Sequence, residues 1–214
     1  MNPTNDTYKT LNAAYEFFNK ELFSGTLPFC LITMQRKGKA RGYFCPERFE
    51  SRNAEGVLVH EIAMNPSLFK DRDDRDILST LLHEMIHLWQ EENGEAPRRN
   101  YHNKQWARKM EELGLIPSNT GEPGGRKTGQ SMSHYINESG KYASIIKEFL
   151  NGSEKIQYQD KPEIVIKRAK KKNKIKYSCQ RCGINAWGKP GVKLMCGADK
   201  VDLVSEDADE EGEV

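Results

Sequence analysis

The chain has 214 residues, which is enough for one ordinary domain with a small appendage and too few for two full-sized domains. Hydrophobic residues make up 36% and charged residues 30%, a composition typical of a globular protein with a highly charged surface. No run approaches the roughly 20 apolar residues that a membrane-spanning helix needs, so we expect no such helix. The formal net charge is only +2, but residues 161–176 are strongly basic and residues 206–213 are acidic.

The N-terminal residues and the cysteines bear on the cellular compartment. The N-terminal segment carries Asp6 and Glu16 where a secretory signal needs a basic flank followed by an apolar core. Cys30 and Cys45 stand singly, and the other cysteines cluster late in the chain, so no disulfide framework is indicated. We therefore expect a cytoplasmic protein.

The first third of the chain predicts one helix and a small sheet. Apolar residues from Tyr8 to Phe23 recur about every 3.6 residues, which predicts a helix with one buried face that ends at Ser24-Gly25. Three short apolar or alternating segments follow, separated by Gly, Pro, Asn and charged clusters, and they predict three strands. These segments are residues 27–35, 42–44 and 57–64. Asn65-Pro66 ends the last strand.

The middle of the chain predicts two helices joined by a polar loop. Acidic side chains within residues 71–76 favour a helix start, because they lie near the positive end of the helix dipole. A broad apolar face follows, which predicts a long and mostly buried helix. Its residues are Ile77, Leu78, Leu81, Leu82, Met85, Ile86 and Trp89. The polar loop, residues 91–100, leads to a helix over about 103–113 that Gly114 and Pro117 close.

The remainder of the chain is less regular. Residues 118–133 are rich in Gly, Ser and Thr and predict an extended loop. Residues 144–150 predict a short helix or an edge segment. After Gly152 the composition shifts to a basic run, then to a segment with three cysteines, and finally to an acidic tail.

The pentad His83-Glu84-Met85-Ile86-His87 carries the strongest chemical signal. Two histidines four residues apart on a helix project from the same face and can share one metal ion, with Glu84 beside them. In a strongly apolar helix an unpaired His or Glu loses solvation at a cost of roughly 1–3 kcal/mol. A metal or a hydrogen-bond network must offset this loss. We favour a zinc site over two core histidines that are satisfied by hydrogen bonds.

A catalytic zinc needs a third protein ligand and keeps one position for water. Gln90 and Asn93 occupy the third and sixth positions after His87, so the ligand must come from farther along the chain. We predict His102, because the preceding polar loop can reverse the chain and the following helix, with Trp106, can pack beside the first. The alternatives are carboxylates that are otherwise ordinary solvated charges: Glu91, Glu92 and Glu95.

The predicted reaction is peptide hydrolysis with Glu84 as the general base. Zinc held by three neutral imidazoles keeps its positive charge and lowers the pKa of water toward about 7. Glu84 then takes the proton and passes it to the departing amine, without a covalent enzyme intermediate.

His60-Glu61 lacks a second histidine, since Met64 stands in its place, and we expect it in a strand that faces the site wall. His134 either hydrogen-bonds an oxyanion or fixes its own loop, and the second role is favoured.

The order and spacing of several motifs resemble the SprT-like family, whose members include a protease of DNA–protein crosslink repair. The matching residues are Glu21-Leu22-Phe23 with Leu27-Pro28, Arg41-Gly42-Tyr43-Phe44, His60-Glu61-Ile62-Ala63 with Asn65-Pro66, the pentad, and His102 ahead of Trp106. Together they span roughly residues 8 to 115. The resemblance implies a compact metallopeptidase domain in which His83, His87 and His102 bind zinc and Glu84 is catalytic. It also implies an α+β fold, with a small mixed or antiparallel sheet packed with zincin-type active-site helices and then a small β-rich, ribbon-like segment.

In that family a zinc-binding segment often follows the catalytic domain. Cys179, Cys182 and Cys196 are similar to such a ribbon, but Asp199 stands where a fourth cysteine is expected. The site therefore binds zinc through three thiolates and a carboxylate, or it has lost its metal and remains as a small packed β-hairpin unit. The predicted division is a SprT-like metallopeptidase domain, a basic linker, a zinc-ribbon-like segment and an acidic disordered tail. Their limits are residues 1–150, 151–176, 177–205 and 206–214.

The basic run from Lys167 to Lys176 lies close in sequence to Tyr177 and Trp187, which suits phosphate neutralisation with nearby base stacking. The run is otherwise a solvated linker, and the resemblance favours DNA. The expected partners are a protein substrate and DNA, with no membrane. Two functions remain open: a metallopeptidase that cuts proteins near DNA, and a DNA-associated adaptor, from a mobile element or a transcription setting, with structural zinc and vestigial cleavage. Glu84 favours the enzyme, because an adaptor does not need it.

Overall fold

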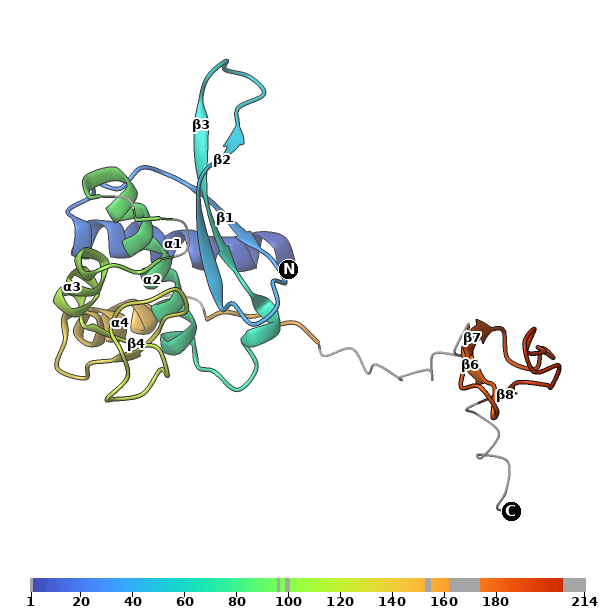
Figure 1. The fold of residues 1–214 in the computed structure, drawn as a ribbon. Coiled ribbons are helices and arrows are strands. Elements are labelled where there is room, and N and C mark those ends of the chain that lie inside the picture. Colours follow the sequence, from blue (N-terminus) through green and yellow to red (C-terminus); the bar gives the residue numbers. More distant parts are fainter. Residues whose placement is uncertain (1, 96, 99–100, 153–154, 162–173, 206–214) are drawn as a thin grey trace. The chain divides into compact units, whose positions relative to one another are not determined.

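The computed structural model describes residues 2–95, 97–98, 101–152, 155–161 and 174–205. The chain divides into two compact units, Met1–Pro162 and Glu163–Val214 (Figure 1). Within the part of the chain that is described, no helix has both the length and the apolar character to cross a membrane.

Four α-helices of the first unit begin and end at capping residues or glycines that the sequence supplies. α1 spans Pro3–Phe23, α2 spans Asp74–Asn93, α3 spans Lys104–Leu113 and α4 spans Lys141–Gly152. The Asp73 and Asn103 side chains accept backbone N–H bonds at the starts of α2 and α3. Ser24 ends α1 in the left-handed conformation, and Gly114 ends α3 with φ 90°. The helix predicted from Tyr8 thus begins five residues earlier, behind an Asn2 cap.

The main sheet of the first unit has three strands in the order β1-β3-β2. β1 (Leu31–Met34) runs parallel to the central β3 (Leu58–Met64), and β2 (Gly42–Glu50) runs antiparallel to it. β2 is longer than predicted and loses regular pairing between Cys45 and Phe49, where Glu47 has φ 47°. A short 3-10 helix, Pro66–Leu68, follows β3 at the predicted break.

A second, two-stranded sheet joins β4 (Leu115–Ser118) to β5 (Ser133–Ile136). Gly114 alone ends α3, and Pro117 lies in β4 opposite His134. Residues 119–132 form the predicted loop between these strands, but the pairing of its two ends was not foreseen. This pairing places His134 beside α2, within hydrogen-bonding distance of Ser79 and His83.

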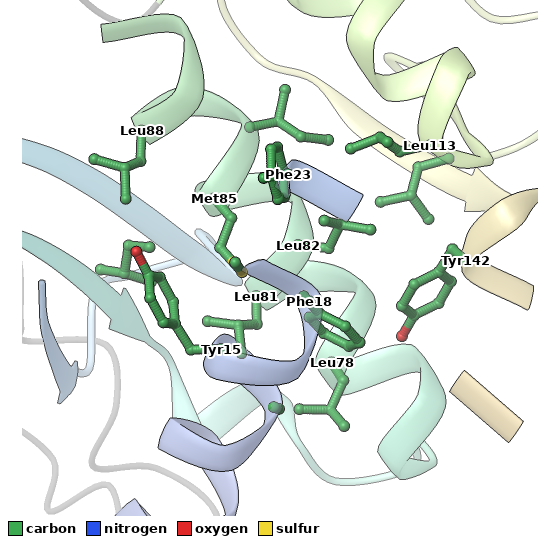
Figure 2. Close-up of a cluster of buried hydrophobic side chains, with 14 of the residues drawn as sticks. Tyr15, Phe18, Phe23, Leu78, Leu81, Leu82, Met85, Leu88, Leu113 and Tyr142 are labelled. Carbon is green, nitrogen blue, oxygen red and sulfur yellow. The ribbon is translucent and has the colours of Figure 1, made fainter. Parts of the chain in front are cut away.

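Helix α2 is the centre of the first unit. It packs against β2, β3, α1, α3 and α4, so almost every side of it is covered. Figure 2 shows Leu78, Leu81, Leu82 and Met85 of α2 among aromatic side chains of α1 and α4. Each fully buried Leu contributes roughly 1.5–3 kcal/mol of transfer free energy. This packing holds α2 rigidly, and the polar residues on the same helix are therefore placed with little freedom.

The described part of the second unit, residues 174–205, contains a small antiparallel sheet with the strand order β7-β6-β8. β6 spans Ile175–Ser178, β7 spans Asn185–Gly188 and β8 spans Val204–Ser205. Its buried residues include Ile175, Tyr177 and two cysteines, Cys179 and Cys196. Together with the first unit, this sheet confirms the predicted α+β class.

The predicted domain limits remain predictions, and the structure adds one detail to them. Residues 155–161 belong to the first unit, where the Ile156 N–H donates to the Asp74 carboxylate at 3.2 Å and Arg36 pairs with Asp160 at 2.6 Å. The basic stretch 167–173 and the acidic tail 206–214 lie outside the described residues.

Candidate metal centre

Three histidines from two neighbouring segments form a metal-type cluster. His83 and His87 lie one turn apart on α2, and His102 lies just before the Asn103 cap of α3. One ligand nitrogen from each ring lies within 4.8 Å of the others. His102 is held in place by a two-way backbone pairing with Gly129, with N–O distances of 2.8 and 3.1 Å. The α2–α3 packing and this bridge together bring the three rings to one point.

Hydrogen bonds define which nitrogen two of these rings can offer. The Nδ1 atom of His102 lies 3.1 Å from the Gly129 carbonyl oxygen. A carbonyl only accepts, so this Nδ1 carries the proton and Nε2 keeps its lone pair. The Nδ1 atom of His83 is likewise occupied, 3.1 Å from Nδ1 of His134. In both rings Nε2 is the nitrogen left for a ligand.

Burial keeps the histidine rings neutral, as metal coordination requires. The pKa of His87 is lowered to about 3, first by burial and then by the nearby His102 ring. Burial also lowers the pKa of His102, and it lowers that of His83 well below the ordinary value, with His134 as the next cause. Three neutral imidazoles are a donor set typical of catalytic zinc, in which water takes the fourth position. The residues present therefore fit a zinc ion.

Trp106 packs against all three rings and forms one wall of the cluster. Its ring centroid lies 4.9 Å from His83, 5.3 Å from His87 and 4.4 Å from His102, and its plane is within 18° of that of His87. The side chain is fully buried. Trp106 was expected only to pack α3 beside α2, and the structure also makes it the residue that restricts the ring orientations.

Glu84 is buried between α2 and β2. Burial raises the pKa of its carboxyl group to about 8, and the backbone N–H of Phe44 opposes this by stabilising the carboxylate. A Cβ on Gly42 would lie only 3.1 Å from the Glu84 Oε1 atom and 3.0 Å from the Ala63 carbonyl oxygen. The strand can therefore approach the carboxylate this closely only because residue 42 is glycine. From the sequence, the Arg41–Phe44 motif contributed only to the family resemblance, and no contact with Glu84 was predicted for it.

The carboxylates considered as alternative third ligands lie outside the histidine cluster. Glu91, Glu92 and Glu95 are not part of the group of ligand atoms around His83. Glu92 instead lies 3.1 Å from Nε2 of His60. His60 is in β3, as expected, and its Nδ1 accepts the Glu47 N–H at 3.0 Å across the irregular part of β2.

His134 is buried and uses both of its ring nitrogens. Nε2 lies 2.8 Å from the Ser79 Oγ atom, and Nδ1 lies 3.1 Å from His83. No ring nitrogen is left over for an oxyanion, which removes the first of the two roles weighed for it. Instead of fixing its own loop alone, His134 contacts a predicted metal ligand. The contact between His134 and His83 depends on the β4–β5 pairing, which was not predicted from the sequence.

The second unit holds another candidate metal cluster. Its ligand atoms also lie within 4.8 Å of one another and belong to Cys179, Cys182, Cys196 and Asp199. The Sγ atoms of Cys182 and Cys196 are 3.6 Å apart. Oδ2 of Asp199 lies 3.3 Å from the Cys179 thiol and 3.5 Å from the Cys196 thiol, so the carboxylate accepts from both.

Two turns of the same geometry present these four side chains. In the turn that begins at Cys179, the first N–H donates to the carbonyl five residues later, and the N–H four residues later donates back to the first carbonyl. The turn that begins at Cys196 repeats both bonds. Each turn ends with a left-handed residue, Gly183 with φ 73° and Lys200 with φ 52°. Asp199 thus occupies the position that Cys182 has in the first turn, which is the position of the missing fourth cysteine.

Comparison with known proteins gives one family and one relative. The SprT-like family model matches residues 11–122, just over half of the chain. An uncharacterized protein in the mucB 3' region of Salmonella typhimurium is 50% identical over 60 residues, which are 28% of this chain and 80% of that protein. No solved structure matches the chain.

Proposed function

The chain belongs to the SprT-like family, and from this premise we propose that it is a zinc-dependent metalloendopeptidase. The observation that carries the proposal is a cluster of three imidazole rings whose ligand nitrogens lie within 4.8 Å of one another. Two of the rings belong to α2, which also carries the buried Glu84, and the third belongs to His102, just before α3. His83, His87 and His102 would hold the zinc, and Glu84 would be the catalytic base.

The chain's own residues supply the remaining parts of a hydrolytic reaction. When bound, zinc supplies a Lewis acid that polarises the peptide carbonyl and acidifies water. The positive charge of bound zinc would favour the ionised form of Glu84 over the protonated form that burial alone favours. The Glu84 carboxylate would then accept a proton from the attacking water and deliver it to the amine nitrogen of the departing peptide. The Phe44 N–H orients this carboxylate, and the Trp106 wall keeps the ligand rings in place. No side chain has to form a covalent intermediate.

The strand arrangement favours a polypeptide substrate in an extended conformation. Among the described residues β2 pairs only with β3 and is an edge strand (Figure 1). Its other edge is therefore open to a further strand, apart from the Phe44 N–H that bonds the Glu84 carboxylate. Gly42 and Phe44 of β2 are the residues that touch Glu84. An extended peptide that adds to this edge through backbone hydrogen bonds would pass the catalytic carboxylate. Backbone recognition of this kind tolerates many side chains.

We propose that the second unit binds a structural zinc and contacts DNA. Cys179, Cys182, Cys196 and Asp199 would be the ligands. Trp187 is 64% exposed and pairs in register with Lys176 across β7 and β6. An exposed indole beside a basic residue suits stacking with an unpaired base and neutralisation of a phosphate. The substrates would then be proteins associated with DNA, as in crosslink repair, and the cytoplasmic location stays a prediction.

The test compares the wild-type chain with Glu84→Gln. Cleavage of an unstructured protein substrate is measured with and without single-stranded DNA. Both chains should bind zinc equally, and only the wild type should cleave the substrate. Glu84→Gln keeps the size of the side chain and removes only the proton acceptor. Near wild-type cleavage by this variant would contradict the role of Glu84. Zinc and DNA binding without any cleavage by the wild type would favour the adaptor.

A further inference from the structure

His83 is the one ligand of the histidine cluster whose ring is bonded to another histidine. His102 donates its Nδ1 proton to a backbone carbonyl, which can only accept. The partner of His83 is the imidazole of His134, with 3.1 Å between the two Nδ1 atoms. An imidazole nitrogen can be either a donor or an acceptor. The pair alone therefore leaves open which of the two rings carries the proton.

The next bonds in the series remove this ambiguity. The Ser79 hydroxyl lies 2.7 Å from the Asp76 carbonyl oxygen and 2.8 Å from Nε2 of His134. The carbonyl can only accept, so the single hydroxyl proton of Ser79 goes to it. Ser79 must then accept from His134, which places the proton of His134 on Nε2 and leaves its Nδ1 bare. His83 consequently donates from Nδ1.

The surroundings support this direction of the bonds. Ser79 is 1% exposed and His134 is 8% exposed, so water does not compete for their polar atoms. The Arg72 guanidinium also donates to the Asp76 carbonyl, which confirms that this oxygen is an acceptor. A neutral ring has one donor and one acceptor, as the series requires.

We propose that Ser79 and His134 are positioning residues that fix the tautomer and the orientation of His83, so that its Nε2 lone pair faces the zinc ion. With the proton on Nε2, His83 could not coordinate, and its Nδ1 would face the bare nitrogen of His134. Ligand histidines commonly depend on such a partner, and its loss weakens metal binding by about 10- to 100-fold. Here the series runs from the Asp76 carbonyl through Ser79 and His134 to the ligand.

The first measurement uses the metal-free full-length wild type. Two-bond proton–nitrogen correlation spectra of the 15N-labelled histidines report which ring nitrogen carries the proton. We expect the proton of His83 on Nδ1 and that of His134 on Nε2. A His83 ring with its proton on Nε2 would overturn the proposal without any variant. The inference rests on the proposed zinc site, but this readout does not depend on zinc or on cleavage.

The second measurement is zinc affinity, by competition with a chelator. Ser79→Ala removes the acceptor of the His134 proton, and His134→Phe removes the acceptor of the His83 proton while it keeps a ring. Both should weaken zinc binding by at least about 10-fold, and Ser79→Ala should give mixed tautomers of His83. Ser79→Thr keeps the hydroxyl and should keep both the zinc affinity and the His83 tautomer of the wild type. Thr10→Val, which removes a buried hydroxyl from α1, should change neither.

Affinities within about 2-fold of the wild type for both Ser79→Ala and His134→Phe would overturn the proposal. A wild-type chain that binds zinc but cleaves nothing contradicts the proposed function and leaves the positioning role standing. The expected tautomers with weakened zinc binding in the variants support it.

Discussion

Gly42→Ala perturbs the close approach between β2 and the Glu84 carboxylate. The new Cβ would lie 3.0 Å from the Ala63 carbonyl oxygen and 3.1 Å from both Glu84 Oε1 and Thr80 Cγ2. The Ala63 oxygen belongs to the β2–β3 ladder and cannot move without disturbing it. The Glu84 side chain therefore has to shift, together with part of β2. We expect a loss of about 1–2 kcal/mol in the free energy of unfolding, at the lower end of the cost of overpacking.

The same change should have a larger effect on catalysis than on folding. A displacement of a catalytic group by 1 Å can lower the rate by about 100-fold, so we expect kcat to fall by about 10- to 100-fold. Zinc affinity should stay close to that of the wild type, because Gly42 touches Glu84 and not the rings. The assays are steady-state cleavage, chelator competition and denaturant unfolding. Gly152→Ala is the matched control, since a Cβ there meets nothing within 4 Å. Wild-type kcat in Gly42→Ala would refute the placement of Glu84 against β2.

Three further predictions follow from the two clusters and from the buried rings. His102→Ala should weaken zinc binding by more than about 100-fold, whereas Glu92→Gln should leave it unchanged, and chelator competition distinguishes these results. Asp199→Ala should weaken zinc binding in the second unit by more than about 10-fold, and Asp199→Cys should strengthen it. The assay is the zinc content after dialysis. An equal zinc content in the wild type and both variants would count against the carboxylate ligand. The metal-free chain should lose stability as the pH falls from about 6.5 toward about 4, because burial lowers the pKa of His87 and His134 to about 3 in the folded state and the unfolded chain then binds more protons. Each of these two rings adds a slope of about 1.4 kcal/mol per pH unit to the free energy of unfolding, and Glu84, whose pKa is raised to about 8, offsets one of the two. Denaturant unfolding at several pH values would detect the remaining slope. A flat profile would contradict neutral buried rings.

The helices and the histidine cluster were predictable because local patterns decide them. The apolar periodicity after residue 76 defines α2, and the pentad on it places two rings on one face. Asn103 followed by an amphipathic run marks α3, and His102 directly precedes it. Caps and periodicity are properties of neighbouring residues, so a single sequence contains them.

The contacts that adjust the site could not be predicted in the same way. β2 continues through Pro46 to Glu50, because an edge strand tolerates a proline that a central strand would not. The β4–β5 pairing joins segments separated by a long polar loop, and no local signal gives its register. The contact of Gly42 with Glu84 and the series from Ser79 to His83 depend on this long-range packing. The candidate ligands were therefore predictable from neighbouring residues, whereas the residues proposed to orient them were not.

The most direct test of the account is a crystal structure of the zinc-supplemented chain with anomalous diffraction data at the zinc edge. The account predicts an anomalous peak about 2.0–2.1 Å from one nitrogen each of His83, His87 and His102, with no fourth protein side chain bound. Rings that point away from one another, or a fourth side chain that completes the coordination, would contradict the proposed hydrolytic site.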